Sequence, residues 1–198
     1  RYFEEEISNE VNLSYSDNQV TVTTDYPTLV YTLNSEGYAS QCVYSLSSQN
    51  RIYQFSYSAE GYLTGIVENI DNTEYSSTSL TYENGDITSI SSKMNGLENK
   101  FIYEPGEESS TYHLPCLGLL EIHPLTFHIE ALYAGLLGKD PRHFTIRSCP
   151  AGSNDEKTIY SYEFDKKGNP SRMICQTTYA GGQASYYPYT RNISVSFE

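Results

Sequence analysis

The chain has 198 residues, of which 25 are acidic and 12 basic, and its formal net charge is −13. Such a charge argues against nucleic acids and anionic membrane surfaces as partners, because their phosphates would repel it. No apolar run is long enough to cross a membrane as a helix, and the length favours one domain, residues 1–198.

The first half of the chain predicts consecutive β-hairpins. Residues 1–27 indicate an opening hairpin with a turn at Asp17-Asn18. Residues 28–93 then carry one hairpin pattern three times, with alternating large side chains that lead into a polar turn and a glycine. These glycines recur every 24 residues, at Gly37, Gly61 and Gly85. Two strands of about eight residues with their turns fill such a period, so the pattern predicts a meander.

A fourth copy of the pattern occupies residues 158–179. It ends its first strand at Gly168 and places Met173 where the earlier copies have an apolar residue five positions after the glycine, namely Cys42, Ile66 and Ile90. The recurrence predicts that these residues share the buried face of the sheet. Between the copies, Phe101–Tyr103 predicts a strand that stops at Pro105-Gly106, followed by a polar loop.

The segment 114–150 interrupts the repeats and predicts a helical insertion. Residues Leu125–Leu137 lose the alternation of a strand, and apolar side chains surround the expected helix. Gly138, followed closely by Pro141, predicts where that helix stops. We therefore expect a mainly β fold, a curved antiparallel meander or incomplete barrel of about 12 strands, with one short helix packed on the inner face.

The repeats of the form Tyr-x-Phe-x-Tyr-x-x-x-Gly-Tyr-Leu, seen at residues 53–63, and the helix sequence Ala-Leu-Tyr-Ala-Gly-Leu-Leu-Gly-Lys at 131–139 carry a resemblance. The chain resembles a Bacteroides-type family of secreted proteins of unknown function, described as having a porin-like fold. The resemblance covers residues 10–197. It implies a curved antiparallel sheet or incomplete barrel and export as a lipoprotein, and it supplies no catalytic residues.

The four cysteines, Cys42, Cys116, Cys149 and Cys175, allow two disulfides in an exported protein. Cys116 and Cys149 are the preferred pair because they flank the insertion. The alternative for Cys42 is a small buried side chain in the core of its repeat.

Histidines and acids near the insertion offer metal or acid–base chemistry. The residues are His113, Cys116, Glu121, His123, His128, Glu130, His143 and Cys149. Pro124 separates His123 from His128, so the two do not form an i,i+4 ligand pair on one helix. We therefore expect no metal and no cofactor. Glu121 and Glu130 are a candidate acid–base pair for glycoside cleavage, but the sequence gives no reason to choose them over other acids.

Tyrosines supply the candidate binding residues. The chain has 20 tyrosines and no tryptophan, and aromatic faces exposed on a concave sheet can stack on a glycan or contact a protein. The candidates are Tyr38, Tyr62, Tyr186, Tyr187 and Tyr189. Tyrosines also line solvated sheets without any ligand, and that interpretation stays open.

The sequence leaves the function unknown. The first hypothesis is a non-catalytic binding or scaffolding module that is secreted, periplasmic or anchored to the outer membrane as a lipoprotein. Its expected partner is a glycan or a protein. We expect that a signal segment preceded Arg1. The alternatives are a carboxylate-dependent hydrolase and a component of an outer-membrane barrel, whose strands also show a period of two.

Overall fold

The computed structural model describes residues 11–23, 28–46, 49–109, 122–153, 155–164, 166, 170–178 and 184–192. Within these residues, one antiparallel sheet of 13 strands follows the order of the chain, each strand pairing with the next. The strands are β1 (Asn12–Ser16), β2 (Gln19–Thr23), β3 (Thr28–Leu33), β4 (Ala39–Leu46), β5 (Gln49–Tyr57), β6 (Leu63–Ile70), β7 (Thr73–Glu83), β8 (Asp86–Met94), β9 (Leu97–Ser109), β10 (His143–Pro150), β11 (Lys157–Phe164), β12 (Pro170–Thr178) and β13 (Ala184–Asn192).

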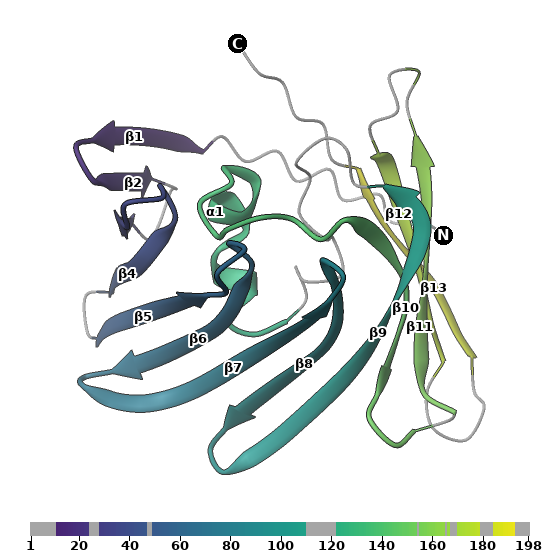
Figure 1. The fold of residues 1–198 in the computed structure, drawn as a ribbon. Helices are drawn as coiled ribbons and strands as arrows, with labels where there is room; N and C mark the ends of the chain where they lie inside the picture. Colours follow the sequence, from purple (N-terminus) through teal and green to yellow (C-terminus); the bar gives the residue numbers. More distant parts are fainter. Residues whose placement is uncertain are drawn as a thin grey trace.

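The sheet curves around a short helical segment, as Figure 1 shows. Residues 122–135, here called the plug, contain a 3₁₀ turn, Leu125–Phe127, and one helix, α1 (Ile129–Tyr133). Among the described strands, β1 and β13 are not paired with each other, so the sheet is open. The predicted curved meander with a helix on its inner face is confirmed. In the described part of the chain, no helix is long and apolar enough to cross a membrane.

The 24-residue period corresponds to equivalent hairpin ends. Gly37, Gly61 and Gly85 all have positive φ, between 85° and 91°, which is the region that side chains disfavour and glycine tolerates. Asn84 also has a positive φ, as expected of an Asn-Gly pair in a primed turn. One trailing position is buried in all three hairpins, at Cys42, Ile66 and Ile90. The side chain of Met173, in the fourth copy, is outside the described residues.

Register aligns inward-facing residues into a row across the sheet. Direct cross-strand partners on β2 to β7 form this inner row, which consists of Val20, Tyr31, Cys42, Tyr53, Glu68 and Ser76. All six side chains are buried. The row begins apolar and becomes polar at Glu68, and the plug lies over it.

The helix is shorter than predicted because its C-terminal cap comes early. The amide of Leu136 donates to the carbonyl of Ala131, and the amide of Gly135 donates to the carbonyl of Leu132. With Gly135 at φ 70°, this pair of bonds forms a Schellman motif. The prediction that Gly138 stops the helix is therefore wrong. The predicted burial is confirmed for Leu125, Leu132, Leu136 and Leu137, which are at most 8% exposed, but not for Phe127, which is 36% exposed.

Two other expectations about this region differ from the structure. β9 continues through Pro105 and Gly106 to Ser109, where the sequence predicted a loop. Proline is tolerated there because the pairing with β10 is irregular around Thr145. The insertion predicted for 114–150 ends earlier, since β10 begins at His143.

The cysteines do not form the preferred disulfide. Cys149 carries a free thiol, so the predicted bond from Cys149 to Cys116 is absent, and Cys116 itself is outside the described residues. Cys42 is also a free thiol and fully buried. The alternative interpretation of Cys42 as a small core side chain is confirmed.

Candidate functional site

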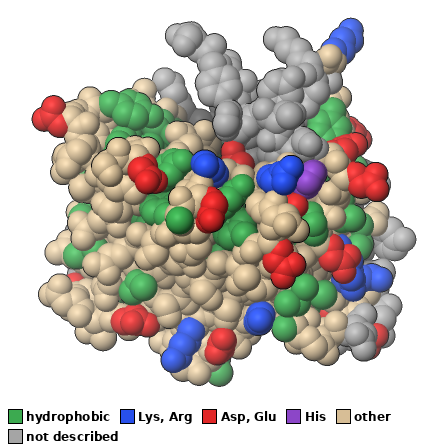
Figure 2. Space-filling view, in the orientation of Figure 1, with side chains coloured by type: hydrophobic (Ala, Val, Ile, Leu, Met, Phe, Trp, Pro, Cys, Tyr) green, Lys and Arg blue, Asp and Glu red, His purple; other side chains and the backbone are tan. Residues whose placement is uncertain are grey.

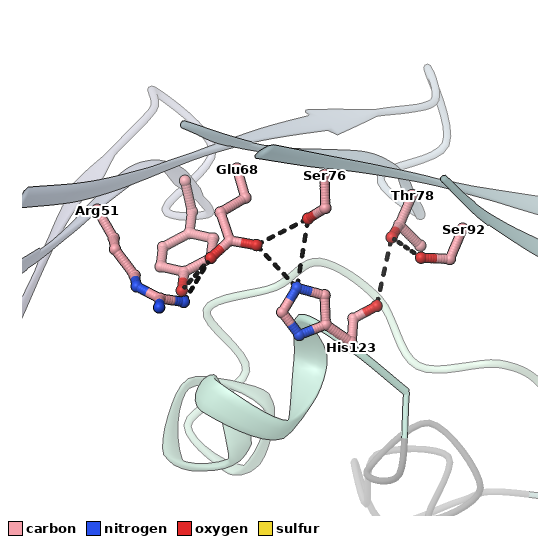
Figure 3. A network of polar contacts seen from close by, with 7 residues as sticks. Arg51, Glu68, Ser76, Thr78, Ser92 and His123 are labelled. Atoms are coloured by element: carbon pink, nitrogen blue, oxygen red, sulfur yellow. Dashed lines mark hydrogen bonds and ion pairs between the residues drawn. The ribbon is translucent and has the colours of Figure 1, made fainter. Parts of the chain in front are cut away.

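A buried carboxylate joins the plug to the sheet. Glu68 lies on the inner row and its side chain is 0% exposed. One carboxylate oxygen, Oε1, accepts hydrogen bonds from Nη1 of Arg51 at 2.9 Å and from the hydroxyl of Tyr53 at 3.1 Å. The other, Oε2, accepts from Oγ of Ser76 and from Nε2 of His123, both at 2.7 Å. Figure 3 shows Glu68 between Arg51 and Ser76 of the sheet, with His123 of the plug reaching the same carboxylate.

The charges in this network explain why an acid is tolerated in the core. Burial alone raises the pKa of Glu68, but the hydrogen bonds from His123 and Ser76 outweigh burial and hold the pKa at about 2. Glu68 is therefore ionised at neutral pH. The same carboxylate acts together with burial to raise the pKa of Tyr53. Buried charges require this kind of pairing, because an unpaired charge in the core is strongly unfavourable.

Aromatic rings surround the solvent-facing side of the network. The Arg51 guanidinium lies 5.9 Å from the ring centroids of both Tyr75 and Phe127. The ring of His123 packs edge-on against Phe127, with the centroids 5.6 Å apart. The side chains of Arg51 and His123 are 22% and 30% exposed. The network therefore reaches the solvent only through its two basic members.

Ser76, His123 and Glu68 are the residue types of a hydrolytic triad, but their geometry differs from one. A triad histidine uses one ring nitrogen for the serine and the other for the acid. Here Nε2 of His123 contacts both, at 3.3 Å from Oγ of Ser76 and 2.7 Å from Glu68. The serine hydroxyl donates its proton directly to the carboxylate and is buried. The arrangement fixes the plug on the sheet and does not activate the serine as a nucleophile.

A second histidine anchors the middle of the plug. His128 is 0% exposed, and its Nδ1 lies 2.8 Å from the hydroxyl of Tyr31. The rings of Tyr31, Tyr53 and Phe55 surround it edge-on, with centroid distances of 5.8, 4.4 and 5.3 Å. Burial lowers the pKa of His128 to about 3, against the attraction of Glu68. His128 is therefore neutral at physiological pH.

The chain after the plug crosses the ends of the three repeated hairpins. We call residues 136–142 the strap. The carbonyl of Leu136 accepts a hydrogen bond from the amide of Ala39 at 2.7 Å, in the first hairpin. The amide of Lys139 donates to the carbonyl of Gly61 at 2.9 Å. The amide of Arg142 donates to the carbonyl of Gly85 at 3.0 Å. In Figure 1 this segment runs from α1 above the hairpin ends to β10.

Two of the predicted tyrosines, Tyr38 and Tyr62, lie at these hairpin ends. We call the surface formed by the three hairpin ends and the strap the tyrosine rim. Tyr38 packs on Tyr57 with the ring centroids 5.3 Å apart, and Tyr62 stacks on Tyr82 at 5.0 Å. Both Tyr38 and Tyr62 are half-buried. Their equivalent in the third hairpin is Asp86, which accepts hydrogen bonds from the backbone and ring of His143.

The rim also carries basic side chains in an acidic protein. Lys139 and Arg142 are exposed on the strap. Figure 2 shows basic side chains and a histidine along the upper middle of this face, with acidic side chains beside them. The rim therefore combines aromatic rings with charges of both signs.

The other sequence candidates are placed only in part. The side chains of Tyr186, Tyr187 and Tyr189 lie outside the described residues, although β13 includes these positions. His113, Cys116 and Glu121 lie outside the described residues as well. Glu130 is half-buried in the first turn of α1. Within the described part of the chain, no three His, Cys, Asp or Glu side chains are grouped so as to hold a metal ion.

The sequence analysis did not single out Glu68, Arg51 or Ser76, although one signal was available. Alternation along β6 places Glu68 on the same face as Ile66, whose burial the repeat predicts. A carboxylate at an inward position indicates a buried partner. The identity of that partner depends on the plug, which the repeat does not describe.

Comparisons with known proteins agree with this architecture. The family described as "Domain of unknown function (DUF4595) with porin-like fold" matches residues 2–172. The chain is similar to the crystal structure of a porin-like protein from Bacteroides uniformis ATCC 8492, with a TM-score of 0.84 and 26% sequence identity. That similarity covers 95% of this chain and 77% of the other. No curated protein matches the chain.

Proposed function

From the premise that the chain belongs to the DUF4595 family of domains with a porin-like fold, we propose that it is a non-catalytic binding or scaffolding module. The observation that carries the proposal is the filled inner face. The plug places Leu125, His128 and Ala131 at 0% exposure against the sheet. A ligand therefore approaches the hairpin ends or the outer surface.

The buried network supports a structural use of the polar residues. Glu68 accepts four hydrogen bonds from the protein itself. A general acid or base needs a site from which a proton can pass to a substrate, and both oxygens of this carboxylate are already occupied. The network fixes the plug, and the plug supports the hairpins that carry the tyrosine rim.

The tyrosine rim is the surface that we assign to ligand binding. Tyr38 and Tyr62 present partly exposed rings on adjacent hairpins, and the Tyr38 ring and the Lys139 side chain of the strap both lie beside Gly61. Aromatic rings with nearby charges suit a glycan or a peptide as the partner. Tyr186, Tyr187 and Tyr189 remain candidates on β13.

The test is a glycan and peptide array probed with the wild-type protein, followed by affinity measurements on any hit. Tyr62→Ala is expected to weaken binding about tenfold, as for an aromatic contact residue near the centre of an interface. Tyr62→Phe keeps the stacking on Tyr82 and serves as the matched control. Tyr187→Ala tests the β13 candidates. Binding to no member of the arrays, or equal binding by Tyr62→Ala and the wild type, would contradict the proposal.

We further propose that the protein is exported and anchored as a lipoprotein, as the family resemblance implies. The test is fractionation of the natural host with an antibody against this chain, and mass spectrometry of the mature N-terminus. A signal in the membrane fraction with a lipidated cysteine ahead of Arg1 would support the proposal. A cytoplasmic signal would contradict it.

A further inference from the structure

The two histidines of the plug have different partners. His123 donates to the ionised carboxylate of Glu68 at 2.7 Å and is 30% exposed. A positive charge on this ring would lie directly beside the ionised carboxylate of Glu68. His128 is fully buried, and its Nε2 has no hydrogen-bond partner among the described residues. A proton added there creates a cation that lacks a paired carboxylate.

The groups that face His128 offer little compensation for a positive charge. The sheet presents neutral side chains, the phenols of Tyr31 and Tyr53 and the ring of Phe55. The thiol of Cys42 interacts with Tyr31 and is itself uncharged, since burial raises its pKa to about 12. The titratable and charged groups that act on this cluster are Tyr31, Cys42, Tyr53, Glu68, His123 and Glu130.

Among these groups, the charge of Glu68 raises the pKa of His128, and His123 lowers it. Both oxygens of Glu68 are already taken by donors. The site therefore favours the neutral imidazole strongly.

We propose that α1 and the strap form an acid-sensitive unit, in which protonation of His128 releases residues 128–142 from the inner face while the His123–Glu68 pair keeps residue 123 attached. This device is independent of the proposed binding function. Its hinge is the non-helical residue between the 3₁₀ turn and α1, His128 itself, at φ −126° and ψ 27°. Released, the segment uncovers Tyr31, Tyr53 and Phe55 on the sheet.

The size of the response follows from the two states of His128. A released histidine titrates near 6.5, whereas the buried ring takes a proton only near pH 3. Between these limits, each unit of acidification raises the ratio of the released to the bound state of residues 128–142 about tenfold. From pH 6.5 to pH 4.5 the ratio rises about fiftyfold, because the released ring is already half protonated at pH 6.5. Glu68 stays ionised throughout this range, because its pKa is about 2, so the attachment at His123 persists.

The experiment is hydrogen exchange with mass spectrometry on the full chain at pH 7 and pH 4.5, corrected for the intrinsic effect of pH. The informative amides are those of Leu132, Leu136, Lys139 and Arg142, which bond within the plug or to the hairpins. Their protection is expected to fall about 70-fold, relative to the amides of β4 to β7. Unchanged protection, or an equal loss across the whole sheet, would overturn the proposal.

His128→Asn is the matched variant. Its amide can still bond with the Tyr31 hydroxyl but does not titrate, so the selective loss of protection at pH 4.5 is expected to disappear. The same acid response in this variant would refute the role of His128. If the variant does not fold, an NMR titration of the wild-type histidine rings decides. A ring that stays neutral until residues 128–142 lose protection supports the proposal, and a ring that titrates near 6.5 in the seated state overturns it.

Discussion

Gly138 is the position where one added methyl group tests the contact between the strap and the hairpins. Its φ is +86°, and a Cβ built there would lie 2.6 Å from the carbonyl oxygen of Gly61 and 3.0 Å from the ring of Tyr57. That carbonyl accepts the hydrogen bond from Lys139. Gly138→Ala therefore forces the strap away from the second hairpin, the middle of its three attachment points.

The expected cost has a conformational and a contact part. An alanine in the left-handed region costs about 1–2 kcal/mol. Displacing the strap adds about 1–3 kcal/mol, typical of overpacking in a tight site with loss of a hydrogen bond. Gly37→Ala is the matched control, because Gly37 has φ +85° and nothing within 4 Å of the added Cβ. The control isolates the conformational part.

Urea unfolding followed by circular dichroism gives the free energy of unfolding for both variants. Gly138→Ala is expected to be less stable than Gly37→Ala by about 1–3 kcal/mol, a difference of roughly 2–10 °C in Tm for a chain of this size. Hydrogen exchange provides a second readout, since the amide of Lys139 is expected to lose protection only in Gly138→Ala. Equal losses of unfolding free energy in the two variants would show that the strap does not pack tightly against Gly61.

Three further predictions test the core and the network. Glu68→Gln is expected to cost about 2–3 kcal/mol near neutral pH because it leaves Arg51 and His123 without their anion. The pKa of Glu68 is lowered from 4.5 to about 2, so its contribution is present above pH 4.5 and is lost as the pH falls toward 2. The gap between variant and wild type in unfolding free energy should close over that interval, and a gap that persists at pH 2 would contradict the assignment. Leu125→Ala, at a fully buried position, is expected to cost about 2–5 kcal/mol, and the exposed neighbour Thr126→Ala less than about 0.5 kcal/mol, by the same unfolding measurement. In native protein a thiol reagent should modify the half-buried Cys149 before Cys42, whose pKa is raised to about 12 by burial. Modification of Cys42 at the rate of Cys149 would show that the inner row is open.

The hairpins could be predicted from the sequence because their signals are local. A glycine after a polar turn and alternating large residues act within one pair of strands. This is why the positive φ of Gly37, Gly61 and Gly85 and the burial of Cys42 and Ile66 followed from the pattern.

The features that escaped prediction depend on contacts between distant segments. β9 continues past Pro105 because β10, about 40 residues later, pairs with it irregularly. Alternation places Glu68 inside, but its charge is tolerated only because the plug brings His123, 55 residues away, to its Oε2. The end of α1 was predicted wrongly for a different reason. The motif at Gly135 is local, and the stronger Gly138-Pro141 signal concealed it.

The strap explains why the first three repeats keep a constant spacing and the fourth does not. Its hydrogen bonds to the hairpins come from residues 136, 139 and 142, and three residues of extended chain span at most about 10 Å. Two strands of a sheet occupy about 9.5 Å, so successive hairpin ends are separated by nearly the full reach of each step. A hairpin longer or shorter than its neighbours would move its end away from the strap residue that it contacts.

The fourth hairpin, formed by β11 and β12, lies beyond β10, where the strap has already entered the sheet at His143. Gly168 is accordingly free of the 24-residue spacing that relates Gly37, Gly61 and Gly85. The 24-residue period thus fits the contact of the hairpin ends with residues 136–142 as well as the length of the strands. Its limit at the third copy marks where that contact ends.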